Sequence, residues 1–146
     1  MALVWLGWKL SDLRRLRGES IGAERGENGC SEDSMRYISG GADEVPARLR
    51  GWVSRYRNDA ESVARQISRV LKPVGTGLVV VGNSNVRGWA IDNAAIYTDA
   101  LIRNGVSVTS EAKRPIPANR RYLPTSAGSA LASRMRSEVV LRLAKN

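Results

Sequence analysis

The chain has 146 residues, and 42% of them are apolar, which is enough for one domain with a modest core. The 23 Lys and Arg residues outnumber the 14 Asp and Glu residues and give a formal net charge of +9, which suits either a polyanionic partner or a solvated basic surface. Histidine is absent and Cys30 is the single cysteine, so an intrachain disulfide, a zinc-type ligand cluster and histidine-based acid–base or triad chemistry are excluded.

The first eight residues are apolar, with no basic residue ahead of them. This segment is too short for a membrane span or a secretory core, so we expect a cytoplasmic protein that binds no membrane. Ser11 and Asp12 offer an N-cap for a short basic helix, which Gly18 can end. Residues 18–43 are rich in Gly, Ser and charge and are predicted to be mostly loop.

Apolar residues recur at steps of three and four from Leu49 to Leu71. One face of one long helix accounts for them, and we interpret this face as core rather than as a groove for a partner. Pro46 suits the first turn, where its missing N–H would have no helical partner, and Pro73 ends the helix.

The run from Leu78 to Val81 is apolar without alternation, which predicts a strand covered on both faces, as in helix-flanked α/β sheets. In open sheets of that kind, ligands bind beyond the carboxyl ends of the strands. Asn83, Ser84 and Asn85 follow this strand and are therefore candidate substrate-binding residues. The alternative is a turn held by local hydrogen bonds between side chains and backbone.

A second amphipathic helix is predicted from Ile91 to Ile102, with Asn104 and Gly105 as its stop. Residues 106–109 alternate between apolar and polar and predict a short strand, and residues 139–143 predict a last one. Between them, residues 113–136 contain prolines and small residues and are predicted to be a long loop. Without an internal repeat, residues 1–146 are interpreted as a single domain.

The predicted loop at residues 113–136 is strongly basic: it holds six Lys and Arg residues and no acidic residue. Arginines on an ordered loop can bridge phosphates or bind guanine, and a tyrosine can stack on an extruded base. The alternative is a charged surface loop whose guanidinium groups cap carbonyls or pair with Glu111 and Glu138. The candidate nucleic-acid-binding residues are Arg114, Arg120, Arg121, Tyr122, Arg134 and Arg136.

The expected order is helix, Arg-Val-Leu-Lys-Pro-x-Gly, strand, helix, strand, long loop and strand. This order resembles the second half of a class I S-adenosylmethionine-dependent methyltransferase. Five segments narrow the resemblance to a bacterial group of amino-methylating DNA methylases, of the N4-cytosine or N6-adenine kind. The stretch Arg-Pro-Ile-Pro-Ala-Asn-Arg-Arg-Tyr is the most diagnostic of them. The segments are residues 3–8, 20–25, 80–84, 114–124 and 134–140.

The resemblance implies an α/β fold, namely the C-terminal half of a Rossmann-like methyltransferase sheet flanked by helices. It also implies S-adenosylmethionine as cofactor, DNA as partner, and no metal. The family's glycine-rich cofactor loop and its Pro-Pro-aromatic catalytic motif do not occur in this sequence, and Gly75-Thr-Gly77 lies before the strand instead of after it. Met1 would lie just after the missing motif. We therefore expect no catalytic residue here and a chain that is silent on its own.

Three origins remain open: a fragment of a truncated or interrupted gene, which we favour, one half of a split enzyme, or a small protein that has kept the fold and lost the activity. Two other functions also remain open. One is a small basic nucleic-acid-binding protein without a cofactor. The other is a half-domain that completes a sheet through an exposed edge, either with a complementary N-terminal half or by self-association.

Overall fold

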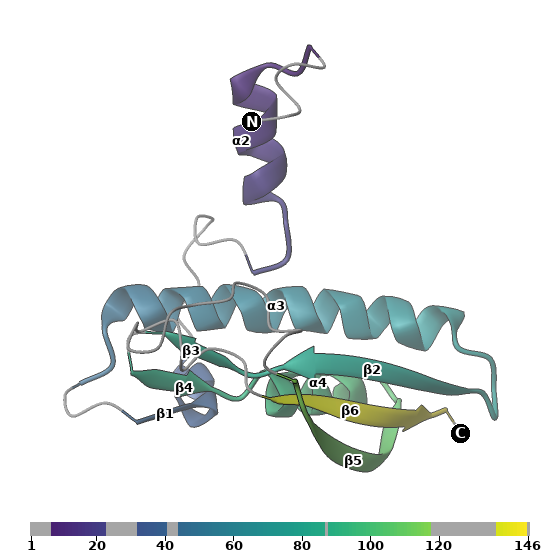
Figure 1. Ribbon diagram of the computed structural model, residues 1–146. Helices are drawn as coiled ribbons and strands as arrows, with labels where there is room; N and C mark the ends of the chain where they lie inside the picture. The colour runs from purple at the N-terminus through teal and green to yellow at the C-terminus, as the bar shows by residue number, and fades with distance from the viewer. Residues whose placement is uncertain (1–6, 23–31, 41–43, 87, 118–136, 146) are drawn as a thin grey trace.

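The computed structural model describes residues 7–22, 32–40, 44–86, 88–117 and 137–145 (Figure 1). These residues form helices and two small sheets, so the predicted mixed α/β class is confirmed. The helices are α2 (Leu10–Gly18), the 3-10 helix η1 (Glu32–Tyr37), α3 (Ala47–Val70) and α4 (Asn93–Arg103).

Both sheets have three strands, and every strand pairing among the described residues is antiparallel. The larger sheet has the order β2–β6–β5, with β6 in the centre, and the smaller has the order β1–β4–β3. The strands are β1 (Ile38–Gly40), β2 (Thr76–Gly82), β3 (Ser84–Val86), β4 (Trp89–Ile91), β5 (Ser107–Pro115) and β6 (Ser137–Ala144).

The predicted single long helix is confirmed as α3, which runs for 24 residues. Pro46 precedes it with a φ of −58°, a value that its ring fixes and that suits entry into a helix. The apolar face of α3 buries Leu49, Val53, Ala60 and Ala64. The small side chains near its middle allow α4 to pack closely against it.

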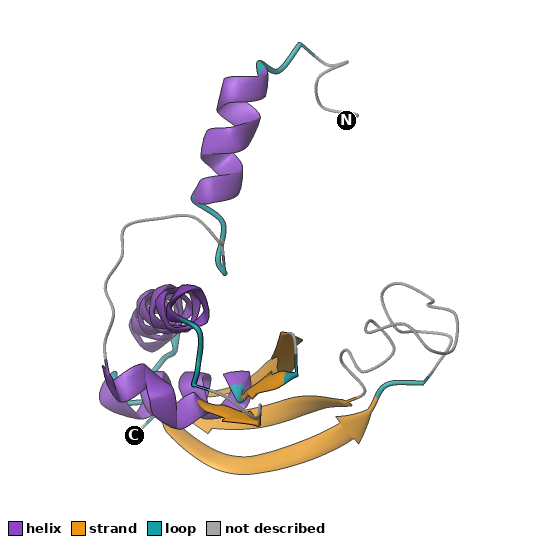
Figure 2. Cartoon of the chain, turned by 90° about the vertical axis from the view of Figure 1, so that its left-hand side faces the viewer, coloured by secondary structure: helices purple, strands orange, loops and turns teal. Residues whose placement is uncertain are grey.

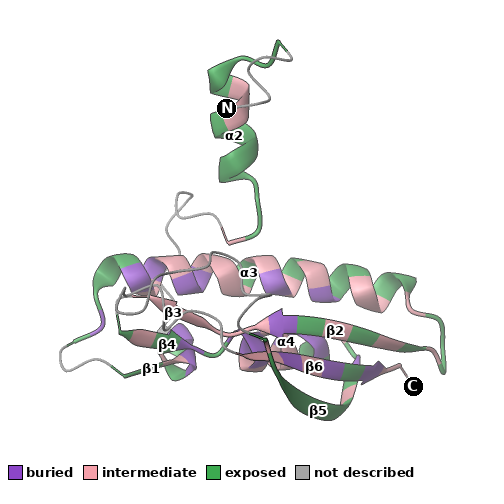
Figure 3. Ribbon diagram, viewed as in Figure 1, coloured by how far each residue is buried: buried purple, intermediate pink, exposed green. Residues whose placement is uncertain are grey.

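The core lies where α4 packs between α3 and the larger sheet (Figure 3). Val53 and Ala60 from α3, Ile96 and Leu101 from α4, and Leu141 from β6 are all fully buried. Burial of a large aliphatic side chain stabilises a fold by about 1.5–3 kcal/mol. This one cluster therefore joins both long helices to the central strand of the larger sheet.

The prediction that the strand at 78–81 is covered on both faces is wrong for the described residues. Val81 is buried and Val79 packs against the core, whereas Leu78 and Val80 are 66% and 52% exposed. The helices cover one face of this sheet, and no described element covers the other (Figure 3). An unbroken apolar run predicts the strand but does not reveal which faces have neighbours.

The segment 18–43, predicted to be mostly loop, contains η1 and β1. Two predicted boundaries also need correction. β5 continues to Pro115 and so includes the start of the predicted 113–136 loop. The second helix begins at Asn93, since Ile91 belongs to β4.

The Lys-Pro-x-Gly segment forms the tight turn between α3 and β2. The Gly75 N–H donates to the Lys72 carbonyl at 2.9 Å, and Val74 has a φ of +59°, a strained value for a β-branched residue. A Cβ on Gly75 would lie 2.6 Å from the Lys72 carbonyl oxygen. Glycine is thus required at position 75 by the turn itself.

Helix α2 stands away from the rest of the described chain (Figure 2) and buries none of its residues. Trp8, just before this helix, is 45% exposed, and Leu10, its first residue, is 54% exposed. The helix carries three arginines. The predicted short basic helix with its end at Gly18 is confirmed, but its N-cap residue is Lys9, and Ser11 and Asp12 lie inside the helix. Among the described helices, none has the length and apolar character that a bilayer crossing needs.

Candidate functional site

Hydrogen bonds hold the polar segment after β2 in place, and the structure puts Ser84 and Asn85 of this segment in β3. The Ala94 N–H at the start of α4 donates to Asn83 Oδ1 at 3.1 Å, and the Gly88 N–H donates to Asn85 Oδ1 at 3.3 Å. Ser84 Oγ accepts from Asn93 Nδ2 at 2.9 Å. The structure thus brings Asn83 and Ser84 together at the first turn of α4, while the side chain of Asn85 serves the β3–β4 turn.

Asn93 is a member of this cluster that sequence reasoning missed. Its side chain is 4% exposed, and Nδ2 also donates to the Gly82 carbonyl, at the end of β2, at 2.8 Å. Asn93 Oδ1 is buried and has no hydrogen-bond partner among the described residues. The sequence signal that could have identified Asn93 is its position as a polar residue directly after the cap residue Asp92. Its role here is to fasten the end of β2 to α4.

The N-terminus of α4 is already capped. Asp92 Oδ1 accepts from the Ala95 N–H at 3.0 Å, and Asn83 Oδ1 takes the Ala94 N–H. Such caps satisfy the backbone donors that would otherwise bind an anion. A ligand phosphate or carboxylate would have to displace these side chains.

The structure describes only the start of the basic 113–136 segment. Arg114 lies in β5, where its Nε donates to Glu138 Oε1 at 2.6 Å, and its side chain remains 66% exposed. This contact is the ion pairing that the alternative interpretation anticipated, although the guanidinium group keeps much of its surface open to solvent. The other candidates lie outside the described residues and stay predictions: Arg120, Arg121, Tyr122, Arg134 and Arg136.

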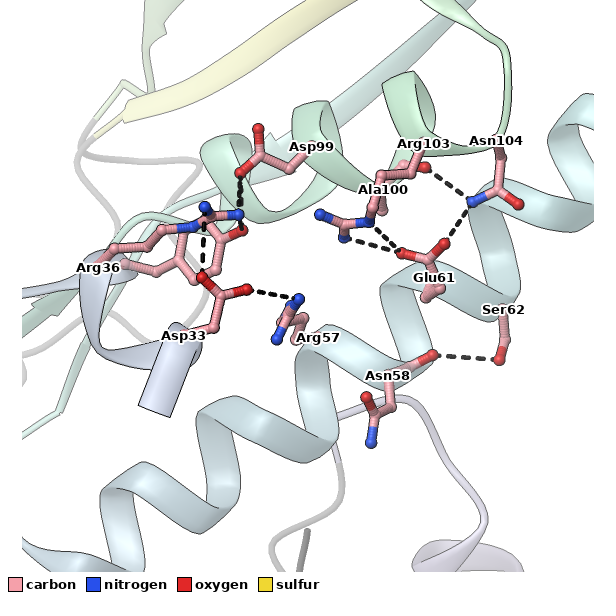
Figure 4. Close-up of polar contacts among 11 residues, drawn as sticks. Asp33, Arg36, Arg57, Asn58, Glu61, Ser62, Asp99, Ala100, Arg103 and Asn104 are labelled. Carbon is pink, nitrogen blue, oxygen red and sulfur yellow. Dashed lines mark hydrogen bonds and ion pairs between the residues drawn. The ribbon is translucent and has the colours of Figure 1, made fainter. Parts of the chain in front are cut away.

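Two charged clusters join η1, α3 and α4 (Figure 4). In the first, Asp99 Oδ2 accepts from the Tyr37 hydroxyl at 2.7 Å and from Arg36 Nη2 at 2.8 Å. Asp33 pairs with Arg57 of α3 at 2.7 Å. These contacts connect residues far apart in the sequence, so no local pattern could have predicted them. They explain why residues 32–40 are ordered into η1 and β1 instead of forming a loop.

In the second cluster, Glu61 of α3 binds the end of α4. Glu61 Oε2 accepts from Arg103 Nη2 at 2.8 Å, and Glu61 Oε1 accepts from Asn104 Nδ2 at 2.6 Å. Burial acts to raise the pKa of Glu61, but the hydrogen bonds from Arg103 and Asn104 outweigh it and hold the pKa below its usual value. The carboxylate is therefore charged at neutral pH and acts as a clamp between the helices.

The remaining shifted groups belong to packing contacts as well. Burial raises the pKa of Tyr56 and of Tyr97, whose rings meet edge to face at 6.1 Å between centroids. Both hydroxyls stay protonated at neutral pH. Within the described part of the chain, no three His, Cys, Asp or Glu side chains are grouped as a metal site would require.

No family model and no curated protein matches the sequence. Among solved structures, the chain is similar to the Putative DNA Modification Methylase from Thermus thermophilus in its complex with S-adenosyl-L-methionine. The TM-score is 0.50 at 16% identity, over 72% of this chain and 42% of that chain. A selenomethionine derivative of the same protein gives a TM-score of 0.47 at 19% identity, over 63% and 37%.

The chain thus spans less than half the length of these structural neighbours. At this identity the likeness concerns the fold: the chain has the fold of part of the S-adenosyl-L-methionine-bound protein. The predicted resemblance to a methyltransferase-like fold is confirmed at that level.

The described glycines do not form a cofactor cradle. Gly75 is required by the turn before β2, and a Cβ on Gly77 would make only ordinary contact, 3.8 Å, with Leu143. The loop after β2 leads into β3, and its amide side chains are engaged in the contacts described above. These two glycines and the amides after β2 therefore provide no cradle for S-adenosylmethionine.

Proposed function

We propose that this chain is the C-terminal half of a DNA amino-methyltransferase-like domain and is catalytically silent on its own. The observation that carries the proposal is the likeness in fold to the S-adenosyl-L-methionine-bound structure, which covers 72% of this chain but only 42% of that one. On this proposal the β2–β6–β5 sheet is one part of a larger Rossmann-like sheet. The cofactor loop and the catalytic motif belong to the other part.

In the complete domain, the segment Asn83, Ser84 and Asn85, at the junction of β2 and β3, faces the target base. It follows the end of β2, and strand ends are where ligands bind in open α/β sheets. The hydrogen bonds of Asn83 and Ser84 to α4 hold this loop in a defined shape. A preformed loop suits recognition, because little ordering is left to do on binding.

DNA is the proposed partner, bound by the basic segment at residues 113–136 in a cytoplasmic protein. Lys113 and Arg114 are exposed at the end of β5, and the segment adds four more arginines and Tyr122. Each phosphate that a basic side chain neutralises releases counterions and adds about 0.9 to the slope of log affinity against log salt. Binding should therefore weaken steeply as the salt concentration rises.

The test is a salt series of fluorescence anisotropy titrations with a labelled DNA duplex. The double variant Arg120→Gln with Arg121→Gln should lower affinity about tenfold and reduce the salt slope by about 2. The matched control, Arg14→Gln with Arg15→Gln, removes the same charge from α2 and should leave both values nearly unchanged. Equal losses in the two double variants would contradict DNA binding by the 113–136 segment.

Two other functions keep specific support. The net charge of +9 favours a small basic nucleic-acid-binding protein that needs no cofactor. Such a protein would also bind DNA in a salt-dependent way, but both double variants would lose the same amount of affinity. The position of β2 at the edge of the larger sheet, among the described strands, favours a half-domain that pairs with another chain.

A further inference from the structure

Among the residues that the structure describes, strand β2 is an edge of the larger sheet. Among the described strands it pairs only with β6, in the antiparallel register that sets Val80 opposite Val140. The Lys145 N–H donates to the Gly75 carbonyl at 3.0 Å. In an antiparallel pair every second residue bonds to the partner strand, so the odd-numbered residues of β2 bond to β6. It follows that Val79 bonds to β6, while Leu78 and Val80 direct their backbone N–H and C=O groups toward the open side.

The opposite edge of the same sheet, β5, is protected against further pairing. It carries Glu111, Lys113 and Arg114, it ends at Pro115, and its register shifts between Val108 and Ser110. Charged residues, proline and bulges are the features by which natural edge strands avoid pairing with other chains.

β2 has none of these features. Residues 76–82 contain no charged residue and no proline, and their register with β6 is regular throughout. The two edges of one sheet thus differ in every protective feature. This contrast indicates that the β2 edge is suited to accept another strand.

The side chains at this edge are apolar and exposed. Leu78 and Val80 are 66% and 52% exposed on the face away from the helices, and Val140 lies beside Val80 on the neighbouring strand. We call Leu78, Val80 and Val140, with the outward backbone groups of β2, the β2 edge patch. A strand added here would satisfy the backbone groups and cover apolar surface at the same time.

We propose that the β2 edge patch pairs with the same patch of a second copy, in an antiparallel arrangement about a two-fold axis at Val79. Such a contact requires a surface that is complementary to itself. Leu78 and Val80 have the same orientation in the strand, so Leu78 of one copy lies opposite Val80 of the other. The two larger sheets then form one six-stranded sheet with an apolar cluster across the axis.

The net charge of +9 on each copy opposes this pairing but does not prevent it. On β6, the basic residue nearest to the proposed axis is Arg142, which lies beside Leu78, and the second copy would place its own Arg142 across the axis. With strands about 4.8 Å apart, these two charges are separated by roughly 15 Å across three strand spacings. This exceeds the screening length of about 8 Å at physiological ionic strength. Because added salt screens the remaining repulsion between two copies that each carry +9, it should favour the dimer, whereas it weakens DNA binding.

Sedimentation velocity of the full chain over a range of concentrations tests the proposal, which does not depend on the proposed function. We expect a monomer–dimer equilibrium that shifts toward the dimer as salt rises. Val80→Pro removes an outward N–H that pairing with β6 does not use, and it should weaken dimerisation at least about tenfold. Leu78→Lys, which adds a charge at the axis, should do the same.

The matched control is Ser107→Lys, which adds the same charge to an exposed position on β5 that is paired with Ala144, outside the β2 edge patch. It should leave the dimer unchanged, and circular dichroism melts show whether each variant keeps its fold. A chain that stays monomeric at every concentration, or a dimer that both Leu78→Lys and Val80→Pro leave intact, would overturn the proposal. A stable complex between this chain and a different polypeptide would also overturn the proposal if Leu78→Lys disrupted that complex.

Discussion

Leu141→Ala should lower the free energy of unfolding by about 2–5 kcal/mol. Leu141 is fully buried at the centre of β6, the strand that joins β2 to β5, and it faces the core that α4 contributes. Its loss removes apolar contacts and leaves a cavity that neighbours on both strands cannot easily fill. Urea unfolding followed by circular dichroism measures the change.

The control for this variant is Leu10→Ala in α2. It removes the same atoms from a side chain that is 54% exposed, on a helix that buries nothing, so it should change stability by less than about 0.5 kcal/mol. Similar small losses in both variants would contradict the packing of α4 on the larger sheet.

Asn93→Ala should lower the free energy of unfolding by about 1–3 kcal/mol, the second largest effect expected for this chain. The substitution removes the donor to the Gly82 carbonyl and the donor to Ser84 Oγ, both in a buried setting. It frees the end of β2 from α4 and so also loosens the loop that we propose to face the target base. Amide hydrogen exchange should show faster exchange in residues 82–86 and in the first turn of α4.

Asn85→Ala provides the comparison. Its side chain accepts one longer hydrogen bond, 3.3 Å, from the exposed Gly88 N–H. Removing this bond should change the free energy of unfolding by less than about 0.5 kcal/mol. If Asn93→Ala were as mild as Asn85→Ala, Asn93 would not be the link between β2 and α4.

The sequence allowed the helices to be predicted well, because the period of α3 and its flanking prolines are local signals. It did not allow the cover of β2 to be predicted, since Leu78 and Val79 are equally apolar and only the neighbouring elements decide which is buried. The end of β5 was taken for loop because its residues are exposed on both faces, so Lys113 and Arg114 show no alternation.

The candidate site was predicted in part. The position of Asn83 and Ser84 beyond β2 followed from the strand and its polar end. Their hydrogen bonds run to α4, so the alternative of local side-chain to backbone bonds describes only Asn85. Asn93 was missed because its partners lie 9 and 11 residues away and its burial depends on how α4 packs. The clamps at Asp99 and Glu61 depend on contacts across 42 or more residues, which no local pattern reveals.

We infer that this chain has the fold of part of a methyltransferase-like protein and cannot bind the cofactor of such a protein on its own. Calorimetric titration of the purified chain with S-adenosylmethionine, repeated after addition of a short DNA duplex, measures this binding. We expect no heat of cofactor binding in either titration. Saturable binding would contradict it, because a cofactor pocket would then exist without the usual glycine-rich loop.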